Sequence, residues 1–171
     1  MTVPDERRAI LEDLWNSDGR RLWAYIVSRL HDPHAAEDLL QDIFMKALAS
    51  NASFQTVQAA RAYLFRSAHN AVVDFWKKAR TLEPVPAKTA DVPASVSGDP
   101  EDLQALDGAL ASLDPADREI LALHYDGGLG YREISAAVDL PLGTVLSRAH
   151  RALRKLARSM RKKGYAGDAI L

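Results

Sequence analysis

The residues best suited to chemistry lie in one stretch near the C-terminus, residues 142–163. This stretch contains eight Arg or Lys side chains and no Asp or Glu. Guanidinium groups can pair bidentately with the edge of a guanine, and Ser or Thr hydroxyls suit phosphate oxygens. The pattern predicts contact with the backbone and bases of a nucleic acid. A basic helix face that is merely solvated is the alternative.

The basic stretch begins inside a segment with the layout of a helix-turn-helix, YREISAAVDLPLGTVLSRAHRALRKL (131–156). A short helix over 131–138 and a long helix over about 142–162 flank a turn at 139–141. Apolar residues at 134, 138, 140 and 145 are spaced to form its small core. In such motifs the start of the second helix enters the major groove of DNA. The candidate DNA-binding residues are therefore Gly143, Thr144, Ser147, Arg148 and Arg151.

The other polar residues do not favour enzymatic chemistry. The chain has no cysteine, and its five histidines are not at paired helical spacing with acidic residues that could complete a metal site. It has neither a P-loop nor a dinucleotide-binding fingerprint. We therefore expect no catalytic residue, no metal, no cofactor and no enzymatic activity.

The N-terminal sequence bears on where the protein works. MTVPDERRAILEDLW carries acidic residues where a signal peptide would carry a basic segment followed by an apolar one. No apolar run approaches the roughly 20 residues that span a bilayer. We expect a cytoplasmic protein without membrane insertion.

Charge is distributed unevenly along the 171 residues, although the net charge is only −1. Residues 81–103 carry one basic and five acidic side chains, whereas residues 104–171 carry ten basic and eight acidic ones. The segment 81–102 also contains four prolines, which favour an extended linker. About 20 residues could span on the order of 65 Å. We therefore predict two modules that can grip sites far apart.

Helical patterns account for both modules, and strand signals are weak throughout. Asp32 and Pro33 mark the start of a helix whose apolar residues recur at helical spacing to about Leu48, and a second helix is predicted over 57–79. Downstream, helices are predicted over 103–112 and 114–125, the latter capped by Asp114. The expected fold is all-α: a module at 1–80, a linker at 81–102, a module at 103–163 and a tail at 164–171.

Three segments resemble one known family. The segment 131–156 is similar to region 4.2 of the sigma-70 family of RNA polymerase sigma factors, above all in its extracytoplasmic-function (ECF) branch. AAEDLLQDIFMKAL (35–48) resembles the helix of regions 2.1–2.2, and ARAYLFRSAHNAVVDFWKKAR (60–80) resembles regions 2.3–2.4. The resemblance implies a sigma factor that directs promoter-specific transcription initiation. Its partners would be core RNA polymerase (the β′ clamp helices and the β flap), promoter DNA and an anti-sigma factor.

The same resemblance assigns roles to residues of the first module. Docking on polymerase falls to Asp38, Gln41 and Asp42, although acids early in a helix could simply complement its dipole. Contacts with the −10 element fall to Phe54, Asn70, Lys77 and Lys78. Phe54 could instead cover the core of its own module, and the lysines could form a solvated helix end. Tyr63, Phe65 and Trp76 fit core positions better than base-stacking ones.

Some positions depart from the family pattern. Leu146 stands where a basic residue is common, so one contact with the −35 element is expected to be missing. Gly130 replaces the usual Ser or Thr cap, and Asp139 occupies a turn position where glycine is frequent. The rival interpretation is a DNA-binding regulator that does not touch polymerase. Its second module would look the same, but residues 1–80 show no receiver or ligand-sensing pattern.

Overall fold

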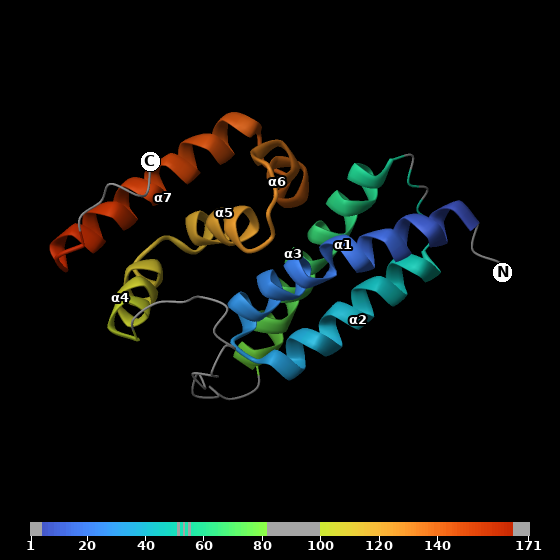
Figure 1. The fold of residues 1–171 in the computed structure, drawn as a ribbon, viewed down its shortest axis with the longest axis horizontal. Coiled ribbons are helices and arrows are strands. Elements are labelled where there is room, and N and C mark those ends of the chain that lie inside the picture. The colour runs from blue at the N-terminus through green and yellow to red at the C-terminus, as the bar shows by residue number, and fades with distance from the viewer. Residues whose placement is uncertain (1–4, 51, 53, 55, 82–99, 166–171) are drawn as a thin grey trace.

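The computed structural model describes residues 5–50, 52, 54, 56–81 and 100–165. These residues form helices and no strand. The helices are α1 (Asp5–Leu30), α2 (Pro33–Ala49), α3 (Val57–Thr81), α4 (Pro100–Ala111), α5 (Pro115–Tyr125), α6 (Tyr131–Val138) and α7 (Leu142–Lys162). Figure 1 shows α1–α3 at one end of the molecule and α4–α7 at the other. No helix among the described residues is long and apolar enough to cross a membrane.

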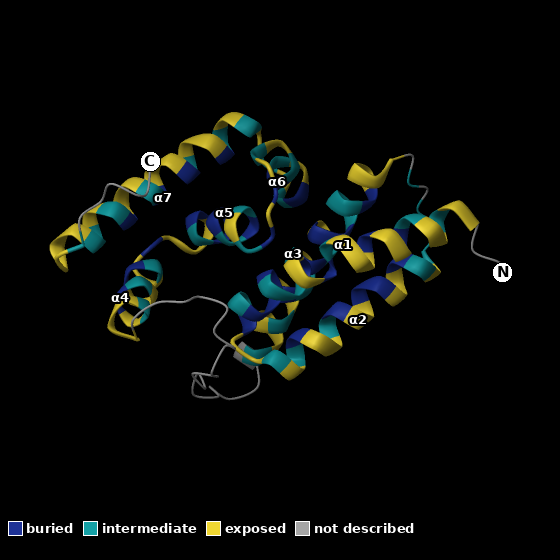
Figure 2. Ribbon diagram, in the orientation of Figure 1, coloured by how far each residue is buried: buried dark blue, intermediate teal, exposed yellow. Residues whose placement is uncertain are grey.

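The first module is a three-helix bundle in which α1 packs against both α2 and α3. His31 turns the chain between α1 and α2 with a positive φ of 54°. Asp32 then caps α2, because its carboxylate accepts hydrogen bonds from the amides of His34 and Ala35, and Pro33 occupies the first turn. The predicted start of this helix is confirmed. Figure 2 shows the buried residues on the inward faces of the helices.

The first helix of the second module begins earlier than predicted. Helix α4 starts at Pro100, so the last three residues of the predicted linker, 100–102, are helical, and residues 82–99 lie outside the described part of the chain. Proline fits there because a helix's first turn needs no amide donor. Asp114 caps α5 by accepting from the amide of Ala116, as predicted. A small apolar cluster of Leu113, Leu121 and Ala152 holds α5 against α7.

Helices α6 and α7 form the predicted helix-turn-helix. Ile134 and Val145 are fully buried between them, which confirms the core positions, while Val138 and Leu140 are partly buried. Asp139 adopts the left-handed conformation with φ 55° and ψ 47°, as the turn requires. Gly130 offers no side-chain cap to α6, but the carboxylate of Glu133 accepts from its amide at 2.8 Å.

The two modules pack against each other, a contact that was not predicted from the sequence. Helix α3 lies against α6, and α1 lies against α5. One apolar cluster extends from Tyr25 and Phe65 of the first module to Ile120 and Leu129 of the second. Gly127 permits the close approach, because a Cβ atom there would meet the ring of Phe65 at 2.8 Å. In this structure the modules therefore form one compact body.

Candidate nucleic-acid interface

The start of α7 presents the predicted DNA-binding residues on one accessible face. Gly143, Ser147 and Arg151 are exposed, and Thr144 and Arg148 are partly exposed. A Cβ atom at Gly143 would meet nothing within 4 Å, so this turn of the helix is open to an approaching surface. Leu146 lies on the exposed side as well, with 44% of its surface accessible. The structure thus brings all five predicted residues together, with an apolar residue among them.

Two of these residues share a partner that the sequence analysis missed. Asp117 of α5 is buried, and its Oδ1 lies 3.2 Å from Nη1 of Arg148. Its Oδ2 accepts from Nε of Arg151 at 3.1 Å, and Oδ1 accepts from Nη2 of Arg151 at 3.3 Å. The hydrogen bond and the charge of Asp117 raise the pKa of Arg151 above its ordinary value. Residues 142–163 contain no acid themselves, but α5 places the carboxylate of Asp117 against two of their arginines.

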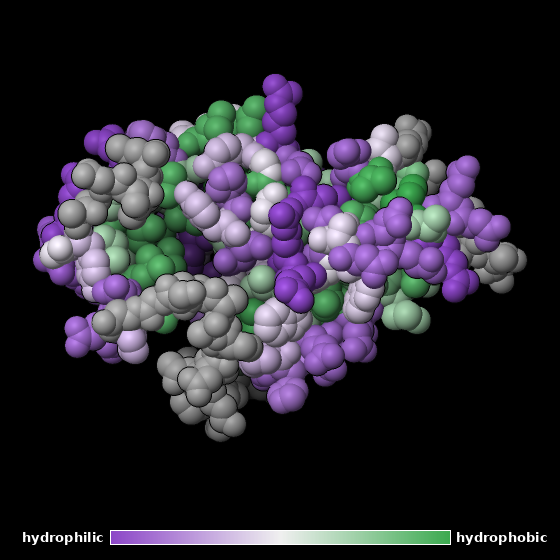
Figure 3. Space-filling model, viewed as in Figure 1, coloured by the Kyte–Doolittle hydropathy of each residue, from purple (hydrophilic) through white to green (hydrophobic). Residues whose placement is uncertain are grey.

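The rest of α7 carries its positive charge along the outer side. Arg154, Lys155 and Arg158 are exposed, at spacings that place them on neighbouring turns. Lys155 reaches back to the carbonyl oxygen of Ser112 at 2.5 Å, and Lys163 donates to the carbonyl of Ala105 at 3.2 Å. Hydrophilic residues surround the end of α7 farthest from α6 (Figure 3). This part of the helix offers charge for phosphates.

The predicted −10 residues lie on or beside α3, and they differ in exposure. Asn70 is exposed in the middle of the helix, and Lys77 and Lys78 are exposed near its end. Phe54 is partly buried against the core, with its ring centroid 5.2 Å from that of Tyr63. Its position supports the interpretation that Phe54 covers the core of its own module.

The aromatic residues of α3 behave differently from one another. Phe65 is 1% exposed, which confirms its core position, and Tyr63 is partly buried. Trp76 is 40% exposed, so its predicted core position is wrong. Its indole nitrogen donates to the carbonyl oxygen of Arg29 at 3.2 Å, and its ring meets Phe75 edge-on. An aromatic residue near a helix end can hold its amphipathic ring at the surface in this way.

The predicted docking residues Asp38, Gln41 and Asp42 are all exposed on α2. The side chain of Asp42 is 68% exposed and lies 3.7 Å from Lys46, one turn further on. Met45 is also exposed, at 64%. The first turn of α2 contains no acidic residue, whereas dipole effects fall off within that turn. Complementing the dipole therefore explains these acids poorly.

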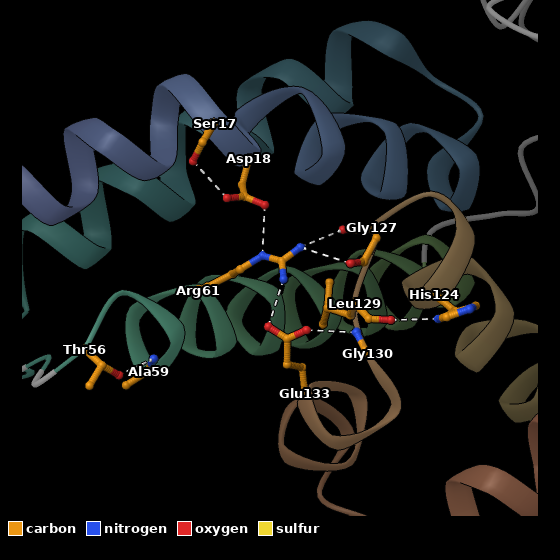
Figure 4. A network of polar contacts seen from close by, with 11 residues as sticks. Ser17, Asp18, Thr56, Ala59, Arg61, His124, Gly127, Leu129, Gly130 and Glu133 are labelled. Atoms are coloured by element: carbon orange, nitrogen blue, oxygen red, sulfur yellow. Dashed lines mark hydrogen bonds and ion pairs between the residues drawn. The ribbon is translucent and has the colours of Figure 1, made fainter.

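Arg61 joins the two modules, although helical periodicity predicts it on an outward face. Its guanidinium contacts Asp18 of α1 at 2.9 Å and Glu133 of α6 at 2.8 Å (Figure 4). It also donates to the carbonyl oxygens of Gly127 and Gly128, at 3.4 and 3.2 Å. Only 15% of its side chain is exposed. Five donors in a rigid fork suit arginine to such a site.

A second polar contact between the modules centres on Glu119 of α5, which is buried. Its Oε1 lies 2.8 Å from Nδ1 of His69, and its Oε2 lies 2.7 Å from Nε of Arg29 in an ion pair. Tyr25 donates its phenol to the same carboxylate. Burial would raise the pKa of Glu119, but the hydrogen bond from His69, the charge of Arg29 and the hydrogen bond from Tyr25 lower it below its ordinary value. A third contact runs from Nε of Arg66 to the carbonyl of Ala136, at 3.0 Å.

His124 has a structural role. His124 stacks on Tyr131 with the ring centroids 4.6 Å apart, and its Nδ1 lies 2.7 Å from the carbonyl oxygen of Leu129. The described residues contain no group of three or more His, Cys, Asp or Glu side chains that could hold a metal ion.

A helical bundle followed by a basic helix-turn-helix defines a class of DNA-binding transcription proteins, and comparison with known proteins narrows it. Residues 14–81 match the family model for sigma-70 region 2, and residues 103–156 match the model for sigma-70 region 4. The ECF RNA polymerase sigma factor SigC of Mycobacterium tuberculosis is 30% identical over 147 residues, covering 83% of this chain and 78% of that protein. The chain belongs to the ECF branch of the sigma-70 family, whose members direct RNA polymerase in promoter-specific transcription initiation.

Other proteins are similar to this chain over most of its length. The RNA polymerase sigma factor YlaC of Bacillus subtilis is 27% identical over 165 residues, covering 92% of this chain and 95% of that protein. Among solved structures, RpoE of Bartonella quintana in complex with the anti-sigma factor NepR matches with a TM-score of 0.67 and 26% identity, covering 88% of this chain and 96% of that one. CnrH in complex with the cytosolic domain of CnrY matches in fold, with a TM-score of 0.66, 23% identity and coverage of 89% and 88%.

Proposed function

We propose that this sigma factor docks on core RNA polymerase through the exposed side of α2 and reads the upstream promoter element with the start of α7. The observation that carries the proposal is the face formed by Gly143, Thr144, Ser147, Arg148 and Arg151, which is accessible on a helix without acidic residues. In a helix-turn-helix the start of the second helix faces base edges. The charges further along α7 serve the phosphate backbone.

Docking of the first module is assigned to Asp38, Gln41 and Asp42, whose partner is the β′ clamp helices of polymerase. The partner of the second module is the β flap. Three features support this assignment. The residues are exposed, the acids stand beyond the first turn of α2, and Met45 adds an exposed apolar side chain beside them. Apolar and charged groups together are typical of a protein interface.

Contacts with the −10 element are assigned to α3. Asn70 is exposed and can hydrogen-bond a base edge, and Lys77 and Lys78 can contact phosphates. The packing of Phe54 against Tyr63 favours a structural role for Phe54. We therefore give the base-contacting role at this end to Asn70 and give Phe54 the role of covering the core of its own module.

An anti-sigma factor is proposed as the regulator. RpoE of Bartonella quintana, which is similar to this chain over most of its length, was solved in complex with an anti-sigma factor. A protein partner that covers α2 or α7 would block docking or promoter contact. We also propose that the chain acts in the cytoplasm, where core polymerase and the chromosome are found, and that it catalyses no reaction of its own.

In vitro transcription over a promoter library tests this function. Purified chain and bacterial core polymerase are incubated with randomised upstream and downstream elements, and the transcribed sequences are counted. We expect a defined pair of elements to be enriched when both proteins are present. Enrichment without added core polymerase, or none with it, would contradict the proposal. A DNA-binding regulator would instead retain promoter fragments without forming a stable complex with core polymerase.

A further inference from the structure

Asp117 is an acid at the edge of a surface that must attract DNA. It lies near the start of α5, outside the helix-turn-helix, and only 5% of it is exposed. Both of its oxygens are engaged by arginines of α7. A carboxylate in this place weakens the attraction for phosphates, so affinity alone does not account for it.

The geometry of Arg151 indicates what the acid does. Along one edge of the Arg151 guanidinium, Nε donates to Oδ2 of Asp117 at 3.1 Å and Nη2 donates to Oδ1 at 3.3 Å. Nη1 forms no hydrogen bond that the structure records among the described residues, so its N–H groups and the second N–H of Nη2 remain available along the other edge of the guanidinium. The side chain is 64% exposed. A guanidinium held along one edge thus keeps a two-donor edge toward solvent.

Arg148 stands in a different relation to the same acid. A single nitrogen, Nη1, contacts Asp117 at 3.2 Å and lies 3.8 Å from Asp114, and 30% of the side chain is exposed. It is the more enclosed of the two arginines. Arg148 is thus placed to hold α5 against α7, and Arg151 is placed to meet a ligand.

A two-donor edge matches guanine, whose O6 and N7 are both acceptors in the major groove. A free arginine must lose rotamer freedom to make this pairing, whereas an arginine already fixed on one side loses less. We propose that Asp117 is a positioning residue that turns Arg151 toward a guanine of the upstream promoter element. This inference rests on the proposed function. It makes the base specificity of α7 depend on Asp117, a residue outside the recognition helix.

A structural ion pair is the competing explanation, since an acid in the first turn of α5 also complements the helix dipole. The two explanations predict different effects on the preference for one base over another. An ion pair that only stabilises the module affects all promoters alike, as does a contact between Arg151 and phosphate. A positioning role affects one base position. Removing a negative charge should meanwhile leave non-specific affinity equal or higher.

The experiment uses holoenzyme formed with the full chain and a set of promoters that differ at single positions of the upstream element. Asp117→Asn is compared with Asp114→Asn, which removes a charge from the same end of α5 at a residue whose carboxylate accepts from the amide of Ala116 and not from Arg151. We expect Asp117→Asn to lower the preference for guanine at one position about tenfold, with transcription from the other promoters unchanged. Asp114→Asn should leave every preference as in the wild type. An unchanged preference in Asp117→Asn, or a uniform loss at all promoters, overturns the proposal.

Arg151→Lys keeps the test decisive if Asp117→Asn does not fold. Lysine retains the positive charge and an ion pair with Asp117 but cannot offer two donors in a fixed plane. We expect the same single guanine preference to fall by about the same factor, and the double variant to lose no more than either single one. Loss of a different preference, or an additive loss, contradicts positioning. Wild-type holoenzyme in the same assay separates this outcome from failure of the proposed function, which would leave no promoter-specific transcript at all.

Discussion

Tyr25 and Glu119 stand 94 positions apart in the chain, yet the phenol of Tyr25 donates a hydrogen bond to the buried carboxylate of Glu119. The contact joins α1 to α5 and therefore joins the module that carries the docking residues to the one that carries the helix-turn-helix. Arg29 and His69 meet the same carboxylate. Burial and the charge of Glu119 raise the pKa of Tyr25 well above its ordinary value, so the phenol stays a donor.

Neutralising Glu119 should loosen the contact between the modules. Glu119→Gln leaves Arg29 without its buried counter-charge, and removing one partner of such a pair costs roughly 3–5 kcal/mol. We expect a larger radius of gyration by small-angle X-ray scattering and a lower unfolding midpoint in urea. Glu12→Gln is the control, because Glu12 forms an exposed pair with Arg8. An unchanged radius and midpoint in Glu119→Gln would show that the contact contributes nothing to the closed form.

Replacing Arg61 should expose α6 selectively. Arg61→Lys keeps one charge but cannot span Asp18, Glu133 and the two glycine carbonyls as a guanidinium does. We expect faster amide hydrogen exchange in α6, with exchange in α2 unchanged. Arg8→Lys serves as the matched control on an exposed pair. Equal exchange in α6 of both variants would mean that Arg61 does not hold the modules together.

Acid should weaken the same contact. The pKa of Glu119 is lowered in the folded chain, so its stabilising effect is present above the ordinary carboxyl pKa of about 4.3 and is lost as pH falls through the folded value. Asp126 contributes the opposite pH dependence of stability, because burial raises its pKa despite the hydrogen bond from Ser28 and the charge of Arg29. We expect urea midpoints measured between about pH 6 and pH 3 to fall more steeply in the wild type than in Glu119→Gln. Parallel curves would contradict this assignment.

Reversing the charge of Asp42 should impair docking alone. Its side chain is 68% exposed and makes one loose pair with Lys46, so Asp42→Arg leaves the core of α2 intact. We expect at least tenfold weaker binding to core polymerase by titration, with an unchanged circular dichroism spectrum. Glu12→Arg places the same charge on α1 and should bind as the wild type does. Normal binding of Asp42→Arg would move the docking surface elsewhere.

Local signals in the sequence predict most of the helices and the face of α7. Asp32 and Asp114 cap helices through amides two or three residues away, so their role is visible in the neighbouring residues. Helical spacing likewise places Ile134 and Val145 in the core. These features depend on short stretches of chain, which is why they are predictable.

The contacts between the modules depend on distant partners and escape such analysis. Periodicity places Arg61 and His69 on a polar face of α3, but it does not reveal that Glu133 and Glu119 cover that face. Asp117 is missed for the same reason, since its partners lie 31 and 34 positions away. The one available signal is an acid, Glu119, next to apolar residues that bury the inner side of α5.

Start-site mapping on one promoter from the library tests the central claim most directly. A fixed amount of core polymerase is titrated with the chain, and transcripts are mapped by primer extension. We expect starts at a single position, with a yield that rises with added chain and levels off near one chain per polymerase. In Arg148→Ala/Arg151→Ala we expect that yield to fall at least tenfold and to depend less on salt. Starts that are the same with and without the chain would contradict the account.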